Sequence, residues 1–293
     1  MMQKIIDPHL HFFDLNKGDY HWLQPHNPPF WPDKNIIFND FNESNIQLDS
    51  QFELAGYVHI EAGYDNNQGW REIERWESSA TISMASMQVL NLAEHPDDFI
   101  DNITQGISRK SFRGGRHIIE SPMAAKDSQN VIKNLKYLSK MKLLFELQID
   151  LADQELCRWT LGILEQVGEL QIVLNHLGFP PSAGTLPFKR WQANFKQLTQ
   201  FKALAVKVSG FEMTNRAFSE DSIKQYCDYA LSELSQEQVL FASNFPLVLF
   251  SYSYQDYWDM VFRALVSLGL DVNKLMYSNA LERYSLTTLS PNK

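Results

Sequence analysis

The chain has 293 residues, 44% hydrophobic and 21% charged, which suits one large α/β domain with a sizeable buried core. Its formal net charge of −9, without a run of lysines or arginines, argues against binding to nucleic acids or to an anionic membrane surface. No segment approaches the roughly 18 apolar residues of a membrane-spanning helix, and the N-terminus shows no leader with a cleavage site, so we expect a cytoplasmic protein.

Short segments rich in Val, Ile, Leu and Phe recur along the whole chain. Such runs are typical of parallel strands that are buried on both faces. Eight of them are predicted strands, over residues 5–12, 55–63, 82–90, 111–119, 142–150, 170–178, 204–212 and 239–247.

Helical periodicity lies between most of these segments. The clearest helix begins at the N-cap candidate Asp153 and ends at Gly168, and another begins near Ser253. Cys157 and Cys227 fall within predicted helices and in no CxxC motif, so we expect packing thiols in a reducing compartment. Further helices are predicted over residues 68–79, 128–140, 188–201 and 219–234.

Strands that alternate with helices indicate a parallel sheet, and eight strands favour a closed (β/α)8 TIM barrel. A doubly wound open sheet is the alternative. We see no linker or internal repeat, so residues 1–293 are predicted to form a single domain.

The segment 17–50 is too long for a simple connection from strand to helix. It is rich in Pro, Asn and aromatic residues. We interpret it as a functional lid or a wall of a pocket, and an irregular surface loop is the alternative.

His9 and His11 lie at the end of the first predicted strand. Alternate side chains of a strand share a face, so the two imidazoles should point the same way. Barrel active sites lie at the carboxyl ends of the strands, and neutral imidazole is a good ligand for zinc and similar metals. This pair is therefore the predicted centre of the site, although HxH alone is a short motif.

Nearly every other strand also carries polar residues towards its end. Any one of these residues could be a structural group, but together they favour a functional site. They are His59 and Glu61, which should share a face, then Arg113, Arg116 and His117, Glu146 and Gln148, Asn175 and His176, Lys207 and Ser209, and Ser243 and Asn244.

Several short motifs occur in the order in which the amidohydrolase superfamily carries them. They are HLHFFD, YHWL, VHIEA, RGGRH, NHLG, VKVSG, SNFP and NALERY, spread over about residues 4–286. The chain most resembles the amidohydrolase 2 branch, which includes sugar-lactone and 2-pyrone-4,6-dicarboxylate lactonases. The resemblance implies a (β/α)8 barrel that hydrolyses a small cyclic ester.

The resemblance also implies roles for individual residues. His9, His11 and His176 would line or hold a metal. Independently of the resemblance, His176 is the candidate general base, because the strand-eight motif has no carboxylate and an unperturbed histidine titrates at about pH 6.5. Asn244 stands at the position of the acid that helps the attacking water. The candidate substrate contacts are Trp22, Arg113, Arg116, His117 and Lys207.

Two positions depart from the pattern of the branch. NHLG stands in place of DHLG, and SNFP in place of SDWP, so Asn175 and Asn244 replace acids. An amide cannot accept a proton as a general base, although its oxygen can hold a water or serve as a neutral ligand. Glu61 is the second candidate base, unless Arg113 or Arg116 holds it in an ion pair.

Three functions remain open on this basis. The first is hydrolysis of a lactone, with the carbonyl polarised by a metal or directly by Arg and Lys side chains. The second is metal-dependent decarboxylation, which Asn244 disfavours. The third is a catalytically impaired barrel that binds or regulates. A divalent metal, with zinc as the first choice, would be weakly bound or absent. The partner would be a small acidic or sugar-derived molecule, and a homo-oligomer is compatible with the sequence.

Overall fold

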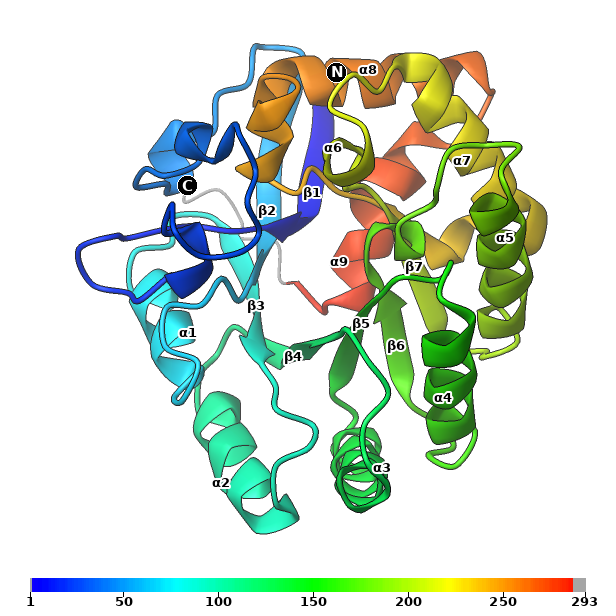
Figure 1. The fold of residues 1–293 in the computed structure, drawn as a ribbon. Helices are drawn as coiled ribbons and strands as arrows, with labels where there is room; N and C mark the ends of the chain where they lie inside the picture. The colour runs from blue at the N-terminus through cyan, green and yellow to red at the C-terminus, as the bar shows by residue number, and fades with distance from the viewer. Residues whose placement is uncertain (1, 287–293) are drawn as a thin grey trace.

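The computed structural model describes residues 2–286. Its eight parallel strands follow one another in chain order within one sheet, so the predicted (β/α)8 barrel is confirmed (Figure 1). The strands are β1 (Gln3–Leu10), β2 (Phe52–Ile60), β3 (Ser83–Val89), β4 (Phe112–Ile119), β5 (Leu144–Ile149), β6 (Gln171–Leu174), β7 (Leu204–Val208) and β8 (Val239–Phe241).

The barrel closes through the chain that follows β8 rather than through a long ladder between β8 and β1. Leu10 forms an isolated parallel bridge with Phe245. The N–H of His11 donates to the carbonyl of Phe245, and the N–H of Asn244 donates to the carbonyl of His9. The closure therefore places the Asn244 segment directly beside His9, in β1, and His11, which follows the strand.

Helices surround the sheet (Figure 1). Asp153 accepts the N–H groups of Glu155 and Leu156, as expected of an N-cap. Cys157 and Cys227 are free and buried, as expected of packing thiols, and each lies within a helix. None of the helices within residues 2–286 is long and apolar enough to cross a membrane. The α-helices are α1 (Trp70–Glu77), α2 (Pro96–Ile107), α3 (Ala125–Lys140), α4 (Gln154–Leu164), α5 (Leu186–Leu198), α6 (Phe211–Thr214), α7 (Glu220–Glu233), α8 (Tyr254–Ser267) and α9 (Asn279–Arg283).

The amino-terminal end of the barrel is filled by the end of the chain. Ala280, Tyr284 and Leu286 pack in one apolar cluster with Ile6 and Val58, which point into the barrel. That end is therefore packed core, and an open site can form only at the opposite end.

Three strands, β6, β7 and β8, end at least four residues earlier than predicted, because the chain turns at their carboxyl ends to present polar residues. β6 ends at Leu174, and His176 follows it in a left-handed conformation (φ 53°). β8 ends at Phe241, and Asn244 is also left-handed (φ 59°). After β7 the chain enters α6. The residues predicted to end these strands lie instead in the loops above the barrel.

Candidate active site

A pocket of about 610 Å³ opens at the carboxyl ends of the strands. Both polar side chains from the strand ends and aromatic rings from the segment 17–50 line it. Its lining includes His11, Trp22, Pro28, Pro29, Trp31, Glu61, Arg116, His117, Gln148, His176, Met213 and Asn244.

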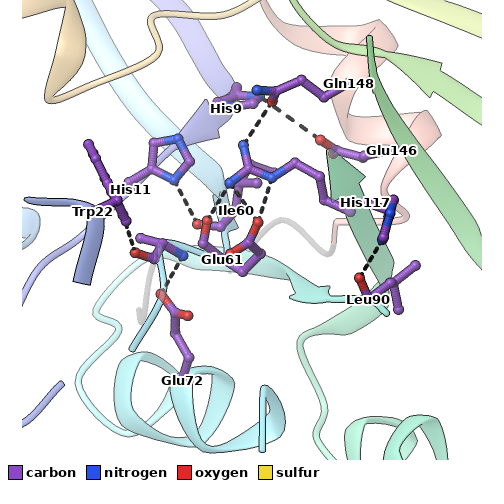
Figure 2. Close-up of polar contacts among 12 residues, drawn as sticks. His9, His11, Trp22, Ile60, Glu61, Glu72, Leu90, His117, Glu146 and Gln148 are labelled. Atoms are coloured by element: carbon purple, nitrogen blue, oxygen red, sulfur yellow. Dashed lines mark hydrogen bonds and ion pairs between the residues drawn. The ribbon is translucent and has the colours of Figure 1, made fainter. Parts of the chain in front are cut away.

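His9, His11 and His176 come together, as the sequence predicts. The ring centroid of His9 lies 5.0 Å from that of His11 and 4.5 Å from that of His176. His11 and His176 line the pocket, whereas His9 is fully buried behind them. The Nδ1 of His11 donates to the carbonyl of Ile60 at 2.9 Å, which leaves its Nε2 with a free lone pair (Figure 2). The Nδ1 of His176 bonds to the hydroxyl of Ser209 at 3.0 Å.

Burial keeps these imidazoles neutral. It is the largest cause that lowers the pKa of all three, and the charge of Lys207 adds to it at His9 and His176. Arg116 lowers the pKa of His11 in the same direction. At neutral pH the rings of His11 and His176, which line the pocket, can therefore accept a proton or offer a lone pair.

Gly210 makes room for the ring of His176. Its φ is +70°, and a Cβ built there would lie 2.5 Å from Cγ and Nδ1 of His176. No side chain fits at this distance unless the imidazole moves.

We therefore expect Gly210→Ala to displace His176 and to lower the catalytic rate at least tenfold. Gly269→Ala is the matched control, because Gly269 has φ +67° and an added Cβ would meet no atom within 4 Å. Both variants should lose roughly 1–2 kcal/mol of stability to the left-handed backbone, and only the first should lose activity. Equal activity of the two variants, measured well below their melting temperatures, would show that the packing of Gly210 does not position His176.

The structure corrects the prediction for Lys207. Its side chain is fully buried beneath the pocket and does not line it. Nζ donates to both carboxylate oxygens of Glu146 at 2.7 Å and to Nδ1 of His9 at 3.1 Å. The hydroxyl of Tyr284 also donates to Glu146, at 2.7 Å. Burial lowers the pKa of Lys207 to about 8. Lys207 therefore supports His9, and its burial below the pocket does not fit the predicted substrate contact.

Arg116 lies in the pocket but is already paired. Its Nη2 is 2.6 Å from Oε1 of Glu61, and its Nε donates to the same oxygen at 2.7 Å. Its Nη1 donates to Oε1 of Gln148 at 3.0 Å (Figure 2). Of the two interpretations of Glu61, the ion pair with an arginine is the one observed. Burial still raises the pKa of Glu61, and Arg116 opposes that rise.

Arg113 and His59 lie outside the pocket. Arg113 is the second residue of β4, and its Nε donates to the carbonyl of Tyr284 at 2.7 Å, at the closed end of the barrel. The prediction that Arg113 contacts substrate is thus corrected. His59 faces α1 and lies 3.1 Å from Glu72, so it does not share a face with Glu61, because β2 ends between them.

His117 lines the pocket, and its Nδ1 donates to the carbonyl of Leu90 at 2.7 Å (Figure 2). Asn175 is fully buried and does not line the pocket, and neither atom of its amide has a partner among the described residues. The predicted substrate contact of His117 is therefore compatible with its position, whereas Asn175 lies too deep for one.

The segment 17–50 forms one wall of the pocket, as predicted. Nε1 of Trp22 donates to the carbonyl of Ala62 at 2.7 Å (Figure 2). Lys34 is buried, and its Nζ donates to the carbonyls of Trp22, Gln24 and Asn27. Arg216 binds Asp33 at 2.8 Å. These contacts hold the wall against the barrel.

Sequence reasoning missed two buried acids of this region. Asp7 accepts from the backbone N–H of Ser243 and the hydroxyl of Tyr254, and so fixes the turn before Asn244. Glu212 accepts from Nδ2 of Asn244 at 2.5 Å. Glu212 lies in GFEMT, at the predicted end of its strand, a position that could have marked it.

The sequence profile of the family described as "Amidohydrolase" matches residues 6–286. The chain belongs to this family. "Uncharacterized protein y4mH" of Sinorhizobium fredii is 25% identical over 297 residues, which cover 96% of this chain and 98% of that protein.

Two solved structures share the fold. An amidohydrolase from Burkholderia multivorans, crystallised with bound zinc, has a TM-score of 0.76 and 18% identity and covers 98% of this chain and 100% of its own. A probable 2-pyrone-4,6-dicarboxylic acid hydrolase from Acinetobacter baumannii, crystallised with citric acid, has a TM-score of 0.67 and 14% identity and covers 96% and 99%. At these identities the likeness establishes the fold alone.

The histidine cluster fits a metal only in part. His11 offers a free lone pair, and Nε2 of His9 is buried without a partner among the described residues. However, Lys207 donates to Nδ1 of His9, which places the proton of a neutral His9 on Nε2, where it prevents ligation. Within residues 2–286 no three His, Cys, Asp or Glu side chains are arranged to hold a metal ion. In this conformation His9 therefore offers no lone pair to a metal, and the metal role of His9, His11 and His176 stays a prediction.

Proposed function

We propose that the protein is a hydrolase that opens a small lactone by attack of water on the ester carbonyl. The observation that carries this proposal is a pair of neutral imidazoles, His11 and His176, in a pocket that also contains the guanidinium of Arg116. A neutral imidazole can take a proton from water, and a fixed positive charge stabilises the oxyanion that then forms.

In the proposed step, water adds to the carbonyl carbon and gives its proton to His176. The ring C–O bond then breaks, and the same proton passes to the leaving oxygen, which yields a hydroxy acid. The charge of Arg116 reaches this region, since it lowers the pKa of both His11 and His176. No step requires Glu61 as a base, because the carboxylate is bound to Arg116.

We propose a neutral, sugar-derived lactone rather than a dicarboxylate as the substrate class. Arg116 is the permanent cation among the described residues that line the pocket, and Glu61 compensates its charge. Trp22, Trp31 and the two prolines of the wall offer flat apolar faces, which suit the C–H faces of a sugar ring.

The test is a screen of the purified protein, in which acid release from neutral sugar lactones is compared with release from cyclic dicarboxylate esters. Turnover of at least one neutral lactone supports the proposal. No turnover of any lactone contradicts it, and release of CO2 from an aromatic acid would favour the decarboxylase. Analysis of the same protein for zinc tests the metal prediction separately.

Glu61→Gln should change the selectivity of the pocket. Loss of the carboxylate leaves the charge of Arg116 uncompensated, so an acidic lactone should gain affinity relative to a neutral one of the same ring size. We expect the ratio of the two kcat/KM values to shift at least tenfold towards the acidic substrate, which is about 1.4 kcal/mol. An unchanged ratio would show that Arg116 does not face the bound substrate.

A further inference from the structure

The side chains of Asn244 and Glu212 form a buried pair at the edge of the pocket. Nδ2 of Asn244 donates to Oε1 of Glu212 at 2.5 Å, and both residues are 1% exposed. Asn244 lines the pocket, whereas Glu212, in the short helix α6 that follows β7, lies behind it. The carboxyl group of Glu212, which follows β7, thus lies behind the amide of Asn244, which follows β8, and accepts its hydrogen bond.

The backbone of Asn244 is held as firmly as its amide nitrogen. Its N–H donates to the carbonyl of His9 at 2.9 Å, and its φ of 59° is a left-handed conformation that asparagine tolerates well. Since Nδ2 is engaged by Glu212, the oxygen Oδ1 is the atom of this amide that remains for the pocket that Asn244 lines. The pocket therefore receives a hydrogen-bond acceptor at this position.

The burial of the Glu212 carboxyl group is not explained by an ion pair. Its second oxygen, Oε2, is buried and has no partner among the described residues. Arg216, on the following segment, donates to the backbone carbonyl of Glu212 and binds Asp33. Burial raises the pKa of Glu212 to about 7. A carboxyl group held in this way costs stability, so its contact with Asn244 is its evident role.

We propose that Glu212 is a positioning residue that orients the amide of Asn244, so that Oδ1 accepts a hydrogen bond from the attacking water. The inference rests on the proposed hydrolysis. His176 lines the same pocket and takes the other proton of that water, so two acceptors would aim its oxygen at the carbonyl carbon. Asn244 thereby contributes to water attack without accepting a proton.

The kinetic test compares Glu212→Met with Glu212→Gln on whichever lactone the wild type hydrolyses. Methionine removes the acceptor and frees the amide to rotate, so kcat should fall at least tenfold with little change in KM. Glutamine keeps an oxygen for Nδ2 and should restore most of kcat. Glu165→Met is the control, because Glu165 is exposed at the end of α4. Wild-type kcat in Glu212→Met, or equal losses in both Glu212 variants, would overturn the proposal.

A second measurement is independent of activity. Asn244→Asp alone opposes two carboxyl groups and should lower the free energy of unfolding at pH 8. Adding Glu212→Gln lets an amide donate to the new carboxylate, so the double variant should regain stability, with a coupling of at least tenfold in the unfolding equilibrium constant. If the changes in unfolding free energy of the two single variants simply add in the double variant, the side chains of Asn244 and Glu212 do not interact, which would contradict the proposal. If the wild type opens no lactone while the coupling is present, the proposed function fails and the pair stands.

Discussion

Lys207→Met is expected to destabilise the folded protein by about 3–5 kcal/mol, because it leaves the carboxylate of Glu146 buried without its cation. Lys207 and Glu146 are both fully buried, and Nζ lies 2.7 Å from each carboxylate oxygen. The hydroxyl of Tyr284 is the other donor to Glu146, and it cannot balance a full charge. Denaturant unfolding followed by tryptophan fluorescence measures the loss.

Two further variants separate this explanation from a general effect of losing a lysine. Lys274→Met removes the cation from an exposed ion pair with Glu237 and should leave the free energy of unfolding nearly unchanged. Lys207→Met combined with Glu146→Gln removes both charges and keeps an acceptor for Tyr284, so it should be more stable than Lys207→Met alone. A double variant no better than the single one would mean that an uncompensated charge is not the cause.

His176→Gln is expected to lower kcat by about 10²–10⁴-fold, the usual contribution of a general base. Glutamine has a similar size and can still bond to Ser209, but it cannot accept a proton. The pKa of His176 is lowered by burial and by Lys207 and Arg116, so its neutral form persists below the ordinary value of 6.5. The acid side of the wild-type profile of kcat/KM should therefore lie below pH 6.5, with activity lost as the pH falls through the lowered pKa.

His95→Gln is the control for this variant, since the side chain of His95 is 67% exposed at the start of α2, outside the pocket. It should retain wild-type kcat. A loss of less than about fivefold in His176→Gln, with the protein fully folded, would assign the base to another group, and His11 would be the next to test.

The architecture could be predicted because its signals are local. Eight apolar runs separated by helical periodicity give a closed parallel sheet, and strand alternation correctly placed His9 and His11 on one face. His11 keeps this face although it follows Leu10, the last residue of β1, because its N–H is bonded to the carbonyl of Phe245. His59 and Glu61 part because Glu61 lies past the last residue of β2, where the chain leaves the sheet.

Depth along a strand could not be predicted from residue type. Arg113 and Arg116 are three residues apart in β4, about 10 Å along a strand, so one lies at the packed end of the barrel and the other in the pocket. Lys207 lies on the inner side, yet Glu146 holds it below the pocket. Such pairings join residues far apart in sequence, and no local pattern announces them.

Glu212 was not predicted for a related reason. It was assigned to the end of a strand, whereas β7 ends at Val208 and a tight turn through Gly210 starts a short helix. Only this turn brings its carboxyl group to Asn244. The sequence shows that Asn244 replaces the usual acid in the SNFP motif. It does not show that the carboxyl group of Glu212 lies behind Asn244.

The most direct test of the central claim is hydrolysis of a neutral sugar lactone in water enriched in oxygen-18, with the spontaneous reaction subtracted. Attack of water on the carbonyl predicts an enzyme-dependent hydroxy acid with the label in its carboxylate and none in its new hydroxyl group. Label in the hydroxyl group, or no rate above the spontaneous one for any lactone tested, would contradict the account.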